Sequence, residues 1–183
     1  IAPYQVVIIP ITREDTADAL NAFAQKLGEQ LENIDVRVLV DASDMRAPDK
    51  MWKWIKRGVP LRVEIGAREM DENNVTVTRR DLGKSSKQTM STDAFVADVK
   101  NMLEQIQHDM YDAVVRRNET MIHDVADLDA LESALAAGKI GFFRIKYDLT
   151  TNEKFNALME KYKISRRCLD DNDPTYVYVA KSY

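Results

Sequence analysis

The chain has little cysteine, histidine, glycine and proline, and each scarcity excludes a class of protein. Its single cysteine, Cys168, cannot form an internal disulfide, which fits a reducing, cytoplasmic setting. Two histidines, His108 and His123, add too few ligands for a tetrahedral zinc site, so we expect no bound metal. Six glycines and five prolines among 183 residues form no low-complexity linker. No apolar run approaches the roughly 20 residues of a membrane-spanning helix, so no membrane partner is expected.

The sequence also lacks the signals of secretion and of common catalytic sites. Ile1 opens a strand-like segment with no basic region ahead of it, and a start without methionine indicates a fragment of a longer protein. No phosphate-binding glycine loop, nucleophile elbow or Ser/His/Asp set is present.

The net charge of −4 is unevenly distributed. Residues 46–87 hold 11 Lys or Arg against 6 Asp or Glu, whereas the rest of the chain holds 15 against 24. A basic patch on an otherwise acidic protein can steer a polyanion toward one face. Charge alone leaves two interpretations open, a nucleic-acid surface and a solvated helix face.

In the first part of the chain, strand patterns alternate with helix patterns. The apolar run Gln5–Pro10 is typical of a strand buried on both faces. Pro48 suits the first turn of a basic helix, and Gly58 suits its end. The other expected elements are a helix opened by the capping box Thr12–Asp15, strands at 35–40, 60–66 and 75–80, and a long helix capped by Thr92. This order predicts an α/β fold with a mixed sheet.

After about residue 115 the pattern changes to a second, smaller α/β unit. We expect helices at 127–137 and 152–163, and strands at 140–147 and 175–180. The first domain is therefore placed at residues 1–110 and the second at 111–183. Within the second, Cys168 is expected to be a small, buried apolar group.

The hairpin at 60–80 carries the clearest chemistry. Its apolar face alternates with a polar face that includes Arg62, Glu64 and Arg80. Arg62 could donate to guanine O6 and N7 or to a phosphate, or it could be a solvated arginine paired with Glu64, and the pattern leaves both open. Trp52 and Trp54 could stack on bases. The alternative, which we favour for Trp54, is packing in the core, with Trp52 at its edge.

Residues 54–69 read Trp-Ile-Lys-Arg-Gly-Val-Pro-Leu-Arg-Val-Glu-Ile-Gly-Ala-Arg-Glu. This run resembles W-E-x-K-G-V-P-x-R-x-E-x-G-P-[KR]-D of class II aminoacyl-tRNA synthetases, most closely the prolyl-tRNA synthetases of archaeal and eukaryotic type. The resemblance implies the anticodon-binding fold of class II synthetases, a mixed sheet of about five strands flanked by helices, followed by a small α/β C-terminal domain. Glycyl, threonyl and histidyl synthetases fit the C-terminal unit poorly.

The resemblance also implies which residues bind the anticodon. Arg62 falls on the anticodon-reading arginine of the family, and Arg68 and Glu69 fall on its [KR]-D pair. A carboxylate suits guanine because it accepts from N1–H and N2–H₂, which single-stranded loops expose. Lys84 falls near a lysine that the family uses, with Lys87 as a substitute. Arg80 and Trp52 complete the predicted tRNA site. The family's glutamate is Ile55 here, which cannot accept a hydrogen bond, so one base contact is in doubt.

The second unit resembles the C-terminal domain of these synthetases, through residues 131–140 and Arg167-Cys168-Leu169, but the zinc-ligand cysteines are absent. The resemblance further implies a proline-specific tRNA as partner and an upstream catalytic domain in the same chain. The parent enzyme would be a homodimer that uses ATP and Mg²⁺, whereas this fragment would hold no cofactor and catalyse nothing alone. The resemblance gives Tyr183 a contact with the catalytic domain; the alternative is that it is merely the last residue. The rival function is a non-catalytic accessory or protein-interaction module that keeps the fold.

Overall fold

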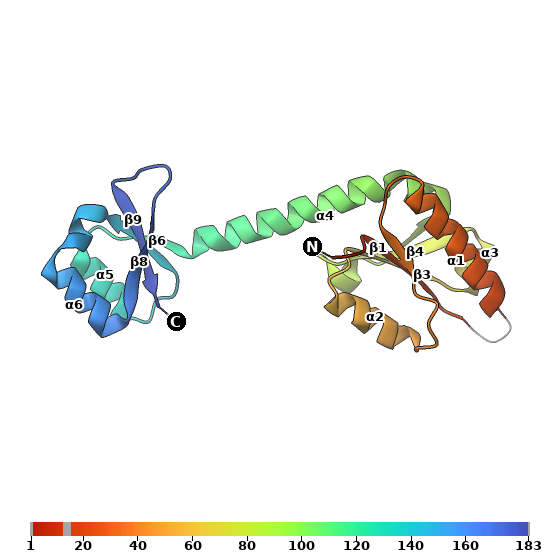
Figure 1. Cartoon of the computed structure of the whole chain (residues 1–183), viewed down its shortest axis with the longest axis horizontal. Helices are drawn as coiled ribbons and strands as arrows, with labels where there is room; N and C mark the ends of the chain where they lie inside the picture. The colour runs from red at the N-terminus through yellow and green to blue at the C-terminus, as the bar shows by residue number, and fades with distance from the viewer. Residues whose placement is uncertain (1, 13–15, 183) are drawn as a thin grey trace. The chain divides into compact units, whose positions relative to one another are not determined.

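The structure, a computed structural model, describes residues 2–12 and 16–182. Asp15 of the expected capping box and the terminal Tyr183 lie outside the described residues. The chain divides into two compact units, Ile1–Tyr111 and Asp112–Tyr183, each containing one sheet (Figure 1). Among the described residues, no helix combines the length and the apolar character needed to cross a membrane.

The first unit is built on a five-stranded mixed sheet with the strand order β2-β1-β3-β4-β5. The strand β1 pairs in parallel with β2 and with β3, and β3, β4 and β5 are antiparallel. The mixed sheet of about five strands is thus confirmed, although its edge strand β5 was not assigned from the sequence. The strands are β1 (Val6–Pro10), β2 (Val38–Val40), β3 (Leu61–Ile65), β4 (Asn74–Arg79) and β5 (Gln88–Ser91).

The two faces of this sheet are covered differently. The helices α1 (Ala17–Glu32) and α4 (Thr92–Thr120) pack against one face, around a core that includes Ile8, Val63 and Phe95. The opposite face receives α2 (Ala47–Lys56), on the other side of the sheet from α1 (Figure 1). There the apolar cluster is small and consists of Val7, Ile9, Trp54 and Val59. The strand β1 therefore carries apolar side chains on both faces, whereas β3 and β4 do not.

The second unit has a four-stranded sheet with the order β6-β7-β9-β8. Its helices are α5 (Leu128–Ala136) and α6 (Glu153–Tyr162), which begin at N-caps Asp127 and Asn152. The core joins both helices to the sheet through residues such as Leu131, Phe143 and Phe155. The strands are β6 (Ile122–Asp124), β7 (Phe142–Lys146), β8 (Ile164–Leu169) and β9 (Tyr176–Lys181). The sequence had indicated β7, β9 and both helices, but not β6 or β8.

The expectation that Cys168 is buried is wrong. It lies exposed on the edge strand β8. Arg166 pairs with Val179 and Leu169 pairs with Val177, so β8 carries one extra residue between these two pairs. Such a bulge interrupts the inward and outward alternation of the strand, and the thiol is left on the surface.

Candidate nucleic-acid interface

Four polar side chains lie together on β3 and β4, on the sheet face against which α2 packs. Arg62 pairs with Thr78, and Glu64 pairs with Thr76. We call these four residues the polar face. Side chains in a strand alternate between faces, so the apolar Leu61, Val63 and Ile65 enter the core while the polar face is turned the other way. The predicted alternation of the hairpin is confirmed.

Arg62 is not a solvated arginine, because only 7% of it is exposed. Among the described residues, its guanidinium has neither a hydrogen-bond partner nor an ion pair within 4 Å. Its nitrogens still reach the surface, since Asn21 is the one described residue with a wholly buried side-chain polar atom that lacks a partner. Burial lowers the pKa of Arg62, and the nearby Glu64 charge opposes that effect. Because these donors reach the surface and have no partner among the described residues, they are available to an acceptor from outside.

Glu64 is also buried, with 8% of the residue exposed. Its carboxylate accepts from the Lys87 ammonium at 2.8 Å, and the Lys87 side chain is half-exposed. Lys87, the substitute named for Lys84, therefore reaches the polar face. Lys84 itself is exposed on the short 3-10 helix η1 (Gly83–Ser86).

The predicted pair Arg68 and Glu69 lies on the short helix α3 (Ala67–Asp71), directly after β3. One Glu69 oxygen accepts from the Gly66 backbone N–H at 3.0 Å, and the other accepts from the Thr76 hydroxyl at 3.3 Å. Glu69 thus borders the polar face and caps its own helix. Arg68 is exposed and pairs with Glu72 at 3.0 Å. The described contacts therefore join Glu69, but not Arg68, to the polar face.

Arg80 ties the end of β4 to the end of α2. Its guanidinium donates to the Gly58 carbonyl oxygen at 2.8 Å. Gly58 has a φ of 79°, which confirms the predicted helix stop, and a Cβ there would lie 2.6 Å from an Arg80 nitrogen. Trp54 is buried, as expected, whereas Trp52 is 62% exposed on α2.

Asp41, just after β2, anchors α2 and was missed in the sequence analysis. Its carboxylate accepts from the Trp54 indole N–H at 2.6 Å and from the Lys53 ammonium at 3.0 Å, and its carbonyl accepts from Lys50 at 2.9 Å. Burial would raise the pKa of Asp41, but hydrogen bonds from Ser43, Trp54 and Lys53 outweigh it and hold that pKa well below its ordinary value. No local motif marks such a residue, because the helix partners follow 9 to 13 positions later.

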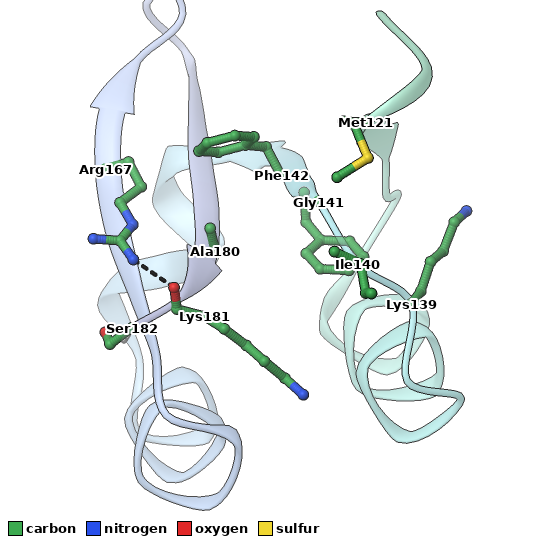
Figure 2. A pocket seen from close by; sticks show the side chains of 10 residues that line it. Met121, Lys139, Ile140, Gly141, Phe142, Arg167, Ala180, Lys181 and Ser182 are labelled. Atoms are coloured by element: carbon green, nitrogen blue, oxygen red, sulfur yellow. Dashed lines mark hydrogen bonds between the residues drawn. The ribbon is translucent and has the colours of Figure 1, made fainter. Parts of the chain in front are cut away.

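A pocket of about 480 Å³ in the second unit offers a different kind of surface. Figure 2 shows Met121, Ile140 and Phe142 on its wall, with Lys139, Arg167 and Lys181 around it. Arg167 donates to the Lys181 carbonyl oxygen, so one of these cations already has a partner. No group of three or more His, Cys, Asp or Glu that could hold a metal occurs within the described parts of the chain. The absence of zinc stays a prediction.

Comparison with known proteins places this geometry in a family. Residues 5–102 match the model of the anticodon binding domain family. The chain is 33% identical to a proline–tRNA ligase of Bdellovibrio bacteriovorus over 184 residues, covering 95% of this chain and 36% of the relative. For the proline–tRNA ligase of Methanosarcina mazei the values are 38% identity over 138 residues, 75% of this chain and 28% of the relative.

The fold is shared with prolyl-tRNA synthetase from Cryptosporidium parvum, solved with L-proline and AMP. The TM-score is 0.82 at 20% identity, over 99% of this chain and 41% of the other. The chain spans about a third of the length of the curated relatives it matches. These matches confirm the resemblance to prolyl-tRNA synthetases, and the chain belongs to the anticodon binding domain family.

Proposed function

We propose that this chain selects a proline tRNA by binding its anticodon loop, as one part of a longer prolyl-tRNA synthetase. The main supporting observation is that Arg62 on the polar face is largely buried while no described residue accepts a hydrogen bond from its guanidinium. A fixed arginine fork is the side chain best matched to guanine O6 and N7. The matched family and the names of the relatives support the same function.

The surrounding residues would hold the rest of the loop. Trp52 is exposed and would stack on an unpaired base. Arg80, at the junction of β4 and α2, and Lys84, on η1, would contact phosphates, as would the exposed Arg68. Glu69 borders the polar face and would contact an anticodon base from there.

The parent protein would supply the chemistry. An upstream catalytic domain in the same chain, acting as a homodimer in the cytoplasm, would use ATP, Mg²⁺ and proline, and this part would add tRNA selection. The share of each relative that the chain covers supports this division.

One observation keeps the accessory-module alternative open. Ile55 stands on α2 at the motif's glutamate position and is 37% exposed, so one expected acceptor near the site is missing. In that case the fold would persist without reading bases.

Binding to synthetic anticodon stem-loops separates the two. The chain should bind the proline stem-loop more tightly than one in which both anticodon guanines are replaced, and affinity should fall as salt rises because phosphate contacts release counterions. Equal binding of the two stem-loops at physiological salt would instead support the accessory module.

A further inference from the structure

Glu64 is the one carboxylate among the four residues of the polar face, and few described contacts account for its burial. Only 8% of it is exposed, and its one hydrogen-bond partner among the described residues is Lys87. The Lys87 side chain is half-exposed, so the pair is partly screened by solvent. The nearby Arg62 charge also acts on Glu64, without a direct ion pair within 4 Å in the described structure. A buried carboxylate with so few direct partners adds little to stability, which indicates a role outside folding.

Glu64 and Arg62 form a matched set on one strand. They are two residues apart on β3, which places both side chains on the same face about 7 Å apart along the strand. No ion pair within 4 Å joins them in the described structure. Arg62 offers only donors and Glu64 offers only acceptors. Thr78 and Thr76 lie opposite them on β4, and all four residues are largely buried.

Guanine is the base that fits this order of groups. Its O6 and N7 accept hydrogen bonds, and the neighbouring N1–H and N2–H₂ donate. Adenine instead presents an N6–H₂ donor beside N7, where a guanidinium needs an acceptor. We propose that Arg62 and Glu64 read one anticodon guanine together, Arg62 at O6 and N7 and Glu64 at N1–H and N2–H₂. This inference rests on the proposed function and makes Glu64 its specificity-determining carboxylate.

Glu69 is less suited to that role in this chain. Both of its oxygens already accept, one from the Gly66 N–H and one from the Thr76 hydroxyl. It holds the start of α3 beside the polar face, so a base that it contacts would be a different one from the guanine at Arg62. Glu64 has to release only an exposed lysine, which is then free to move toward a loop phosphate.

The test uses the whole chain and six stem-loops. These are the proline stem-loop, versions with inosine or with 7-deazaguanine at each anticodon guanine in turn, and one with both guanines replaced. Inosine lacks the N2 amino group, and 7-deazaguanine lacks N7. At one position, both changes should weaken binding by the wild-type chain.

Glu64→Gln should weaken binding of the proline stem-loop about 10- to 100-fold and remove most of the inosine penalty. Glu69→Gln and Lys87→Met, the matched controls, should keep the inosine penalty at the guanine that Glu64 reads, whatever they do at the other guanine.

The outcomes separate this inference from the proposed function. If the wild-type chain binds the guanine-free loop as well as the proline loop, both fail. If it discriminates, but Glu64→Gln keeps the full inosine penalty or Glu69→Gln removes it, only the inference fails. Should Glu64→Gln not fold, the wild-type penalties still test whether one guanine is read at both edges, and Glu69→Gln tests the other carboxylate. Inosine and 7-deazaguanine penalties at different positions would show that no single guanine is read by both residues.

Discussion

Each unit places an arginine in the middle of a strand, but the two arginines have opposite surroundings. Arg144 of β7 donates to Asp170 and Asp124, and its guanidinium lies 3.8 Å from the centre of the Tyr176 ring. Its hydrogen bond to Asp170 raises the pKa of Arg144 above the ordinary value. Arg62 of β3 is more deeply buried, yet no described residue accepts a hydrogen bond from it.

The difference shows how to separate a structural arginine from a binding arginine. Arg144 on β7 binds the carboxylates of Asp124 and Asp170 and so connects three segments of its own unit. Its role is therefore complete within the fold. Arg62 is held in place by packing while no described residue accepts from its donors, which is the condition of a preorganised binding group. Burial alone would indicate that Arg62, the more buried of the two, is the structural arginine. The hydrogen bonds of the two side chains distinguish them correctly.

The largest difference between the two arginines should appear when each is replaced by methionine. Arg62→Met should weaken binding of the proline stem-loop by about 1–3 kcal/mol, because a bidentate base contact is lost, and should leave the melting temperature nearly unchanged. Arg144→Met should do the reverse, because Asp170 is left buried without its partner. Binding titrations and thermal unfolding of both variants, with hydrogen exchange at β9 to locate the loss, give the two readings.

An unfolded Arg62→Met variant would show that Arg62 is structural after all. Weaker RNA binding by a folded Arg144→Met variant would show that the second unit also contributes to the interface. Either result would remove the distinction drawn between the two arginines.

Asp41→Asn tests whether α2 is anchored by a charge. The substitution should cost about 1–2 kcal/mol of stability at neutral pH, because hydrogen bonds to an ionised acceptor are the stronger ones. The pKa of Asp41 is lowered in the folded state from 3.8, so its contribution is fully present above about pH 4 and is lost as the pH falls below that value.

Thermal unfolding between pH 7 and pH 3 measures this effect. The wild-type chain should lose more stability over that range than Asp41→Asn, since the variant has no carboxylate to protonate there. Ser43→Ala, which removes one donor to the same carboxylate, is the milder control. Parallel pH curves for the wild type and Asp41→Asn would contradict the anchoring role.

Much of this fold was predictable, and the parts that were not share a physical cause. The apolar run of β1, the alternation of β3 and β4 and the glycine stop at Gly58 are local patterns, and all were found. The strands β5, β6 and β8 have no such pattern, because each lies at a sheet edge and buries little. Their positions depend on pairing with strands distant in sequence.

The residues of the candidate site also fall into two groups, those that a local pattern reveals and those that only tertiary contacts reveal. Arg62, Trp52 and Trp54 could be named from the sequence because alternation and helix spacing set their faces. The anchoring by Asp41, the capping by Glu69 and the contact of Lys87 with Glu64 depend on tertiary distances. The exposure of Cys168 depends on a bulge that no residue type signals.

The smallest expected effect concerns Lys84 and sharpens the boundary of the interface. Lys84 is exposed on η1, and we expect it to contact a phosphate rather than a base. Lys84→Ala should weaken the proline and guanine-free stem-loops by the same few-fold factor. It should also reduce the slope of log affinity against log salt by about 0.7, the value for one phosphate contact in a single strand.

Lys139→Ala removes a cation at the pocket of the second unit and serves as the matched control. If the contrast between the units holds, Lys139→Ala leaves the slope unchanged. An equal drop in slope for both variants would mean that the RNA backbone reaches both units, and a change with Lys84→Ala on one stem-loop alone would make Lys84 a base-reading residue.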